Sequence, residues 1–159
     1  MTHLTTVERT SDRDLVATRI IDAPPLRVFE AWTRPPLIQK WWAPASFGIT
    51  FLSCETDVRA GGAYRYVFSH PAWDQPMAFF GRYLEVEPPS RLVWTNEEAP
   101  DGPVTTVTFE ESDGGTRVVV QDVYPSRETL DAAMETGGPG GWPEQFDALD
   151  DLLAIPGVG

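Results

Sequence analysis

The sequence predicts a single α+β domain in which an antiparallel sheet packs against a C-terminal helix. Three observations lead to this prediction. Apolar and polar residues alternate over most of the segment 47–123, which is typical of strands with one buried face. Short runs of Gly, Pro, Asp and Ser separate these strands and have the chemistry of turns. The segment 142–153 instead carries its apolar residues at helical spacing.

The predicted C-terminal helix has one apolar stripe, formed by Trp142, Phe146, Leu149 and Leu153 at positions i, i+4, i+7 and i+11. Its carboxylates fall mostly on the other side, so we expect that side to face solvent. An isolated amphipathic helix of this length is only marginally stable in water. We therefore expect a concave, apolar face of the sheet to receive the stripe.

The other predicted elements follow in chain order. Residues 1–13 form a disordered N-terminal arm, and residues 14–155 form the one domain. Val28, Phe29 and Trp32 have helical spacing and indicate a short helix, which a second helical turn follows before Trp42. A further short helix is predicted over 127–135. The predicted strands are 15–21, 47–55, 63–70, 77–86, 91–96, 104–110 and 116–123.

The composition and the charge exclude several classes of protein. The chain has 159 residues and a formal net charge of −12, and its few basic residues form no cluster. Nucleic acids and anionic membranes require a cationic surface, so we expect neither as a partner. No apolar run approaches the length of a membrane span, and the N-terminus lacks the apolar core of a signal peptide. We therefore expect a cytoplasmic protein.

Few residues have the chemistry of a metal site or of a catalytic group. Cys54 is the single cysteine and the carboxylates are scattered, so no metal-ligand spacing is present. We expect no metal, no cofactor, and an inert Cys54. His70 is the one histidine outside the N-terminal arm and could transfer a proton near neutral pH. Its position at a strand end, before Pro71, is more typical of a surface residue, so it is a weak catalytic candidate.

Glu85 lies among apolar strand residues and leaves two alternatives open. If its side chain faces inward, burial favours the protonated form and makes it a candidate acid or base. If a bulge turns it outward, it is an ordinary ion-pair partner of Arg82 or Arg91. The catalytic residues are therefore unknown from the sequence, with His70 and Glu85 as the weak candidates.

The strand 63–70 carries the most aromatic face of the chain. Alternation places Tyr64, Tyr66, Phe68 and His70 on one side, which we expect to look into a cavity beneath the C-terminal helix. An apolar pocket edged by a few polar groups is typical of small-molecule sites, whereas the alternative is that these side chains only fill a core. The predicted ligand-binding residues are Tyr64, Tyr66, Phe68, Phe79, Tyr83, Trp94, Phe109, Val118, Trp142 and Phe146.

Several segments resemble one known family, in the same order along the chain. They are Ala23–Thr33, Trp41–Pro44, Asp57–Tyr64, Gly81–Thr95 and Gly141–Trp142. Together they resemble the START-like (SRPBCC) superfamily, and most closely its branch named after the activator of the heat-shock-protein-90 ATPase homologue. The resemblance implies a helix-grip fold, in which a curved antiparallel sheet wraps around a long C-terminal helix and leaves a cavity between them.

The same resemblance implies a class of function. Members of the superfamily bind small apolar or aromatic molecules, and some close polyketide rings or hydrolyse their ligands. Our leading hypothesis is a protein that binds a small hydrophobic or aromatic molecule. One alternative is a polyketide cyclase- or hydrolase-type enzyme in which Tyr64, Tyr66, His70 or Glu85 polarises the substrate. A second alternative is a co-chaperone-like protein-interaction module. Because superfamily members often pair, a homodimer is also expected.

Overall fold

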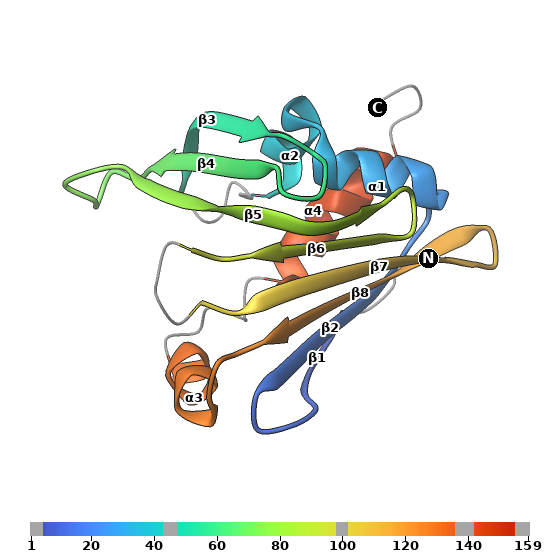
Figure 1. Cartoon of the computed structure of the whole chain (residues 1–159). Coiled ribbons are helices and arrows are strands. Elements are labelled where there is room, and N and C mark those ends of the chain that lie inside the picture. Colours follow the sequence, from blue (N-terminus) through green and yellow to red (C-terminus); the bar gives the residue numbers. More distant parts are fainter. Residues whose placement is uncertain (1–4, 43–47, 98–101, 136–141, 155–159) are drawn as a thin grey trace.

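The computed structural model describes residues 5–42, 48–97, 102–135 and 142–154 (Figure 1). The strands are β1 (Thr6–Arg9), β2 (Asp14–Ile21), β3 (Thr50–Thr56), β4 (Ala63–Ser69), β5 (Met77–Glu87), β6 (Arg91–Thr95), β7 (Val104–Ser112) and β8 (Gly115–Val123). The helices are α1 (Pro25–Thr33), α2 (Pro35–Trp41), α3 (Arg127–Glu135) and α4 (Trp142–Leu153). Within these described ranges, no helix has the length and apolar character needed to cross a membrane.

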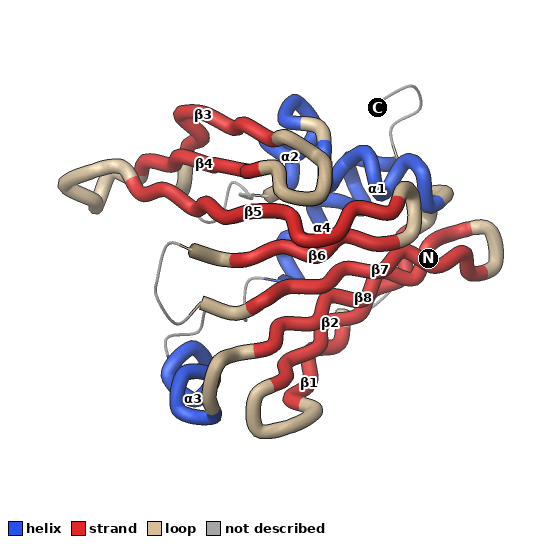
Figure 2. The backbone as a smooth tube through the Cα atoms, in the orientation of Figure 1, coloured by secondary structure: helices blue, strands red, loops and turns tan. Residues whose placement is uncertain are grey.

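The strands form one antiparallel sheet in the order β1-β2-β8-β7-β6-β5-β4-β3. The sheet is curved, with α1, α2 and α4 together on its concave side, whereas α3 lies apart from them beyond the end of β8 (Figure 2). Helix α4 packs on α2, α1 and β2. This arrangement confirms the predicted α+β helix-grip fold.

The period of two in the sequence corresponds to one buried and one exposed face of the sheet. On β2, every second side chain is buried, and these include Ala17, Arg19 and Ile21. Inward residues of β7 and β8, such as Val107 and Val120, continue the same face. The helices contribute the other half of the core, with Val28, Phe29, Trp32, Trp41, Phe146 and Leu149 among their buried residues.

The N-terminal arm differs from the prediction. Disorder was expected for residues 1–13, but Thr6–Arg9 form β1, which pairs antiparallel with β2 from Thr6 opposite Thr18 to Arg9 opposite Leu15. The prediction of disorder is wrong for these residues. The sequence does not reveal the strand because all four side chains of β1 are exposed and show no apolar pattern. The strand forms because its backbone can pair with the outer N–H and C=O groups of β2. Residues 1–4 lie outside the described residues.

The apolar stripe of α4 is buried as predicted, but its acidic side does not simply face solvent. Arg19 of β2 is 3% exposed, and its guanidinium nitrogens lie 2.8 Å from Asp147 Oδ1 and 3.2 Å from Asp150 Oδ2. A buried guanidinium needs charged partners, and both carboxylates belong to α4. Asp150 is consequently only 19% exposed, so an ion pair joins the helix to the sheet in addition to the apolar contacts.

Replacing Asp150 by Asn is expected to lower the free energy of unfolding by about 1–2 kcal/mol, because Arg19 stays buried and loses one of its two carboxylate partners. Urea denaturation followed by circular dichroism measures the change. Asp151→Asn is the matched control, since Asp151 is the next residue of α4 and is exposed. The control should change stability by less than about 0.5 kcal/mol. Equal stability of the two variants would contradict a role of Arg19 in holding α4.

Candidate functional site

A pocket opens between the concave face of the sheet and helices α1 and α2. It is lined by Trp32, Trp42, Tyr64, Tyr66, Phe79, Tyr83, Trp94 and Asn96. The cavity between these walls has a volume of about 20 Å³, which is room for roughly one water molecule. Typical small-molecule sites have volumes of roughly 300–1,000 Å³. The pocket is therefore narrow. An aromatic ligand would have to move the walls apart, and a flat one would move them least.

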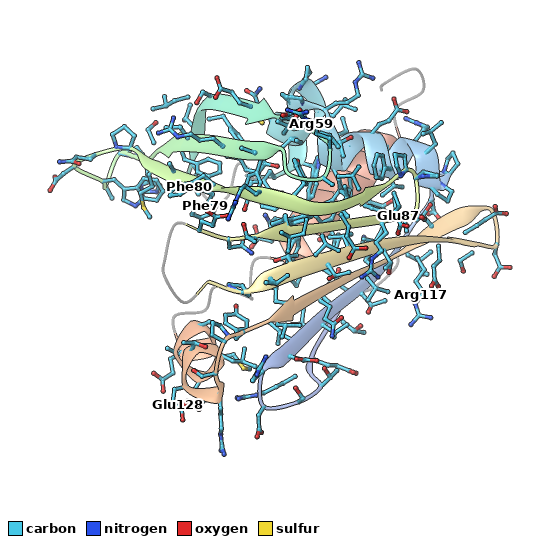
Figure 3. All side chains as sticks on the ribbon, in the orientation of Figure 1. Arg59, Phe79, Phe80, Glu87, Arg117 and Glu128 are labelled. Atoms are coloured by element: carbon cyan, nitrogen blue, oxygen red, sulfur yellow. The ribbon has the colours of Figure 1, made fainter. Side chains whose placement is uncertain are left out.

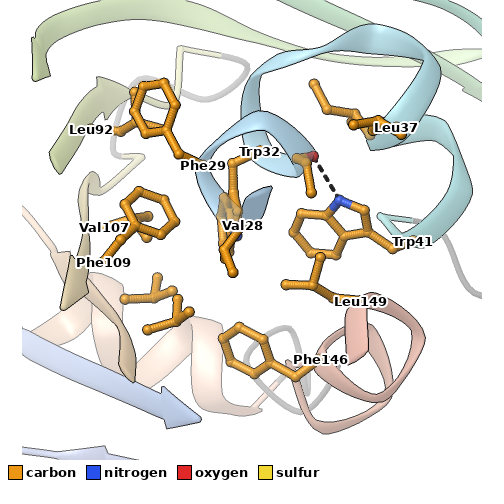
Figure 4. Packing of buried hydrophobic residues seen from close by; sticks show 14 of the residues in the cluster. Val28, Phe29, Trp32, Leu37, Trp41, Leu92, Val107, Phe109, Phe146 and Leu149 are labelled. Carbon is orange, nitrogen blue, oxygen red and sulfur yellow. Dashed lines mark hydrogen bonds between the residues drawn. The ribbon is translucent and has the colours of Figure 1, made fainter. Parts of the chain in front are cut away.

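Trp32 connects the pocket to the hydrophobic core. Its ring centroid lies 4.7 Å from that of Trp41 and 5.9 Å from that of Trp94. Figure 4 shows Trp32 on α1, with Phe109 of the sheet and Phe146 of α4 nearby, and their centroids lie 6.0 and 6.5 Å from that of Trp32. Packing on several sides leaves the Trp32 ring little freedom, so it forms a rigid wall of the pocket.

Helix α4 supports the pocket but does not line it, which differs from the prediction of a cavity directly beneath this helix. Trp142 is the first residue of α4, and its ring stacks on Trp32 at 5.9 Å and meets Trp42 edge-on at 6.0 Å. Gln145 Nε2 also donates a hydrogen bond to the carbonyl of Trp42 at 2.8 Å. Helix α4 thus contacts two lining tryptophans, Trp32 and Trp42, without lining the pocket itself.

Asn96 supplies the amide group of the pocket, and its partners determine its orientation. Its Nδ2 donates to the Pro103 carbonyl at 2.8 Å and to Thr105 Oγ1 at 2.9 Å. Because a carbonyl can only accept, the Pro103 contact requires Nδ2 on that side. Asn96 Oδ1 therefore faces Tyr64, and the Tyr64 hydroxyl lies 3.5 Å from it. The shorter hydrogen bond of this hydroxyl goes to the Thr95 carbonyl, at 2.7 Å.

The hydrogen-bond network continues from Asn96 through Thr105 to Asp122 of β8. Thr105 Oγ1 donates to Asp122 Oδ1 at 2.6 Å. Burial raises the pKa of Asp122 to about 6, although the hydrogen bond from Thr105 acts in the opposite direction. Asp122 therefore changes its charge close to neutral pH, and Asn96 and Thr105 connect it to the pocket.

The phenols of Tyr66 and Tyr83 lie in the pocket wall and remain protonated. Burial is the main reason that the pKa of each lies well above its usual value. A protonated phenol donates and accepts hydrogen bonds but does not serve as a base at neutral pH. None of the described lining residues is an acid, a lysine or an arginine, so the wall they form is polar at a few points and uncharged.

The structure brings part of the predicted ligand-binding set together. Tyr64, Tyr66, Phe79, Tyr83 and Trp94 line the pocket. All five lie on β4, β5 and β6, which are adjacent in the sheet. The predicted aromatic face of β4 thus forms a pocket wall together with its neighbouring strands.

The other predicted residues do not line the pocket. Phe68 stands beside it, with its ring 5.2 Å from that of Phe79. Phe109, Val118 and Phe146 are buried in the core, and Trp142 stacks behind Trp32. These residues do not line this pocket, because alternation identifies the inward side of a strand and not whether a cavity lies there. Their part in ligand binding stays a prediction.

The two weak catalytic candidates lie away from the pocket lining. His70 Nδ1 accepts a hydrogen bond from the Ala72 N–H at 2.9 Å, and its ring packs on Trp73 at 5.3 Å. Glu85 is exposed and lies 3.4 Å from Arg91 Nη2, after a bulge between Tyr83 and Glu85. The outward alternative for Glu85 is therefore the one observed. The inward alternative, which acid–base catalysis by Glu85 would require, is wrong.

Cys54 is half-buried on β3 and is not among the lining residues. Burial, with a smaller effect from the charge of Glu55, raises the pKa of its thiol to about 11. Since the thiolate is the reactive form, Cys54 is a poor nucleophile at neutral pH.

Three lining residues were not predicted from the sequence: Trp32, Trp42 and Asn96. A helix residue that faces a pocket has the same spacing as one that faces a solid core, so nothing local distinguishes Trp32. Asn96 did leave a signal. It follows Trp94 by two positions, on the same face, and an amide that continues an aromatic strand face indicates a polar point in the wall.

Comparisons with known proteins agree with this architecture. In solved structures, a protein from Rhodobacter sphaeroides is similar at 25% sequence identity with a TM-score of 0.85, covering 94% of this chain and 97% of that one. A protein from Mycobacterium smegmatis is similar at 25% identity with a TM-score of 0.81, covering 94% and 96%. The AHSA1-like protein from Aeromonas hydrophila has the same fold at 23% identity with a TM-score of 0.72, covering 92% and 95%.

A search of curated proteins gave no match. A family match covers most of the chain, from residue 22 to residue 154, and includes every residue that lines the pocket. The family is described as Activator of Hsp90 ATPase homolog 1-like protein. Its solved relatives have the START-like (SRPBCC) fold seen in this chain. The protein is therefore a member of the family of Activator of Hsp90 ATPase homolog 1-like proteins.

Proposed function

We propose that the protein binds a small hydrophobic or aromatic molecule in the pocket between the sheet and helices α1 and α2. The observation that carries the proposal is the composition of the wall, in which seven aromatic side chains and one amide enclose a narrow space. Small-molecule sites are usually built in this way, with a mainly apolar lining and a few fixed polar groups. The START-like fold commonly binds hydrophobic ligands, which supports the same site.

Binding is favoured over catalysis by the chemistry of the lining residues. Acid–base catalysis needs a group that exchanges a proton near the working pH. The described lining offers phenols with raised pKa, indoles and an amide, while His70 and Glu85 lie elsewhere. No observation in the described part of the chain favours the cyclase or hydrolase alternative, or the co-chaperone-like module. The cytoplasmic location and the homodimer stay predictions.

Native mass spectrometry of the protein purified from its own host tests the proposal. A reproducible extra mass that leaves on denaturation is the expected result. A second measurement needs no endogenous ligand. Because Trp32, Trp42 and Trp94 line the pocket, titration with naphthalene should change the tryptophan fluorescence in a saturable way. A bare mass, together with unchanged fluorescence across naphthalene and a panel of aromatic compounds, would overturn the proposal.

Replacing Phe79 by Ala is expected to weaken naphthalene binding about tenfold, because the ring lost belongs to the pocket wall. Phe80→Ala is the matched control. The two residues are equally exposed, at 38% and 39%. They are neighbours on β5 (Figure 3), and alternation directs Phe80 to the opposite face of the sheet. The control should change the dissociation constant about twofold or less. Equal losses in both variants would place the naphthalene site elsewhere.

A further inference from the structure

Trp32 carries a buried hydrogen-bond donor that the fold leaves unused. Its side chain is 3% exposed and lines the pocket, and its indole Nε1–H has no hydrogen-bond partner among the described residues. Trp41, which packs against it, differs in this respect, since its Nε1 donates to the Ala31 carbonyl at 2.8 Å, the dashed line in Figure 4. A buried donor without a partner destabilises a protein by more than a typical hydrogen bond stabilises it. Such a donor in a folded protein therefore calls for an explanation, and one explanation is that it binds a ligand.

No other polar group of the described lining accepts a hydrogen bond from the Trp32 indole N–H. Asn96 Oδ1 lies 3.5 Å from the Tyr64 hydroxyl, and neither Asn96 nor the phenols of the pocket accept a hydrogen bond from Trp32 Nε1. The described lining also contains no charged side chain that could balance an ionic ligand. Because burying an unpaired charge is strongly unfavourable, the wall favours a neutral molecule.

We propose that the pocket selects neutral, planar aromatic molecules that carry a hydrogen-bond acceptor, such as a ring nitrogen or a carbonyl oxygen, and that this acceptor binds the Trp32 indole N–H. The proposal rests on the proposed function, because it names the class of ligand for the same pocket. A planar molecule needs the smallest separation of the closely spaced walls, the aromatic wall favours a ring, and the Trp32 donor favours an acceptor. Specificity arises because a ligand without an acceptor leaves the donor unpaired.

The test compares naphthalene with quinoline, which has the same shape and replaces one C–H by an acceptor nitrogen. Dissociation constants are measured at pH 8, where quinoline is neutral, for the wild type and for Trp32→Phe. The variant keeps an aromatic ring and removes the donor. Quinoline affinity should fall about tenfold further than naphthalene affinity in Trp32→Phe, since the ring nitrogen then stays buried without a partner. The comparison of two ligands cancels the contact area lost with the indole.

Trp41→Phe is the control, because it removes an indole from the same cluster that does not line the pocket. It should weaken both ligands by the same factor. A measurement on the wild type alone covers the case in which Trp32→Phe does not fold. The indole N–H resonance of Trp32 should move downfield with quinoline and not with naphthalene.

The outcomes separate the two proposals. If both ligands bind and Trp32→Phe weakens them equally, or if the Trp32 resonance responds to them alike, acceptor selection is wrong and ligand binding stands. If neither ligand binds the wild type, and no other planar aromatic compound does, both proposals fall. A preferential loss of quinoline binding in Trp32→Phe, but not in Trp41→Phe, supports acceptor selection.

Discussion

Replacing Phe146 by Ala is expected to lower the free energy of unfolding by about 3–5 kcal/mol, the range for removing a fully buried aromatic ring. Phe146 is 0% exposed and belongs to the apolar stripe of α4. Its ring stacks on Trp142 at 5.3 Å and lies 6.5 Å from Trp32. The cavity left behind would lie where α4 meets the tryptophans that support the pocket, so the substitution should also weaken ligand binding.

Urea denaturation followed by circular dichroism measures the effect on stability. Asp151→Ala serves as the control, because Asp151 lies on the same helix and is exposed, so its loss leaves no cavity. It should change the free energy of unfolding by less than about 0.5 kcal/mol. A loss for Phe146→Ala below about 1.5 kcal/mol would mean that the surrounding side chains collapse into the space, and would contradict the rigid core described above.

Replacing Asp122 by Asn is expected to raise the free energy of unfolding near pH 7.5 by up to about 3 kcal/mol. The pKa of the carboxyl rises from 3.8 in the unfolded chain to about 6 in the folded protein, and each unit corresponds to about 1.4 kcal/mol. The figure is an upper limit because part of the side chain reaches solvent. Asn is uncharged at every pH and still accepts the hydrogen bond from Thr105.

The pH dependence has a definite sign. Below a pH of 3.8 the carboxyl is protonated in both states, so the raised pKa has no effect on stability. Between there and pH 6 the folded protein keeps a proton that the unfolded chain has released, and stability falls as the pH rises. Above pH 6 the loss is complete and constant. The stability of Asp122→Asn relative to wild type should therefore grow across this window and then level off.

Denaturation curves of both proteins at a series of pH values measure this difference directly. Asp151→Asn provides the control, since it makes the same chemical change at an exposed position. Its difference from the wild type should stay small throughout. A stability difference for Asp122→Asn that does not vary with pH would contradict the raised pKa of this carboxyl.

The sequence by itself determines the kind and the order of the elements. Strand 63–70 and helix 127–135 correspond closely to β4 and α3, because a period of two or of 3.6 residues is a local property of the chain. The apolar stripe of α4 is equally local, and it implies that a concave apolar surface exists. The inward aromatic face of β4 follows from alternation alone.

Only the tertiary structure decides what each inward side chain meets. Phe79 and Phe109 both face inward from strands, yet Phe79 lines the pocket, whereas Phe109 packs against Phe29 of α1 in the core. Arg19 has its carboxylate partners on α4, 128 and 131 positions away in sequence. The Trp32 indole N–H has no hydrogen-bond partner among the described residues. Alternation specifies a direction, whereas a cavity, an ion pair or an unsatisfied donor is a relation between distant segments, and only packing in three dimensions establishes it.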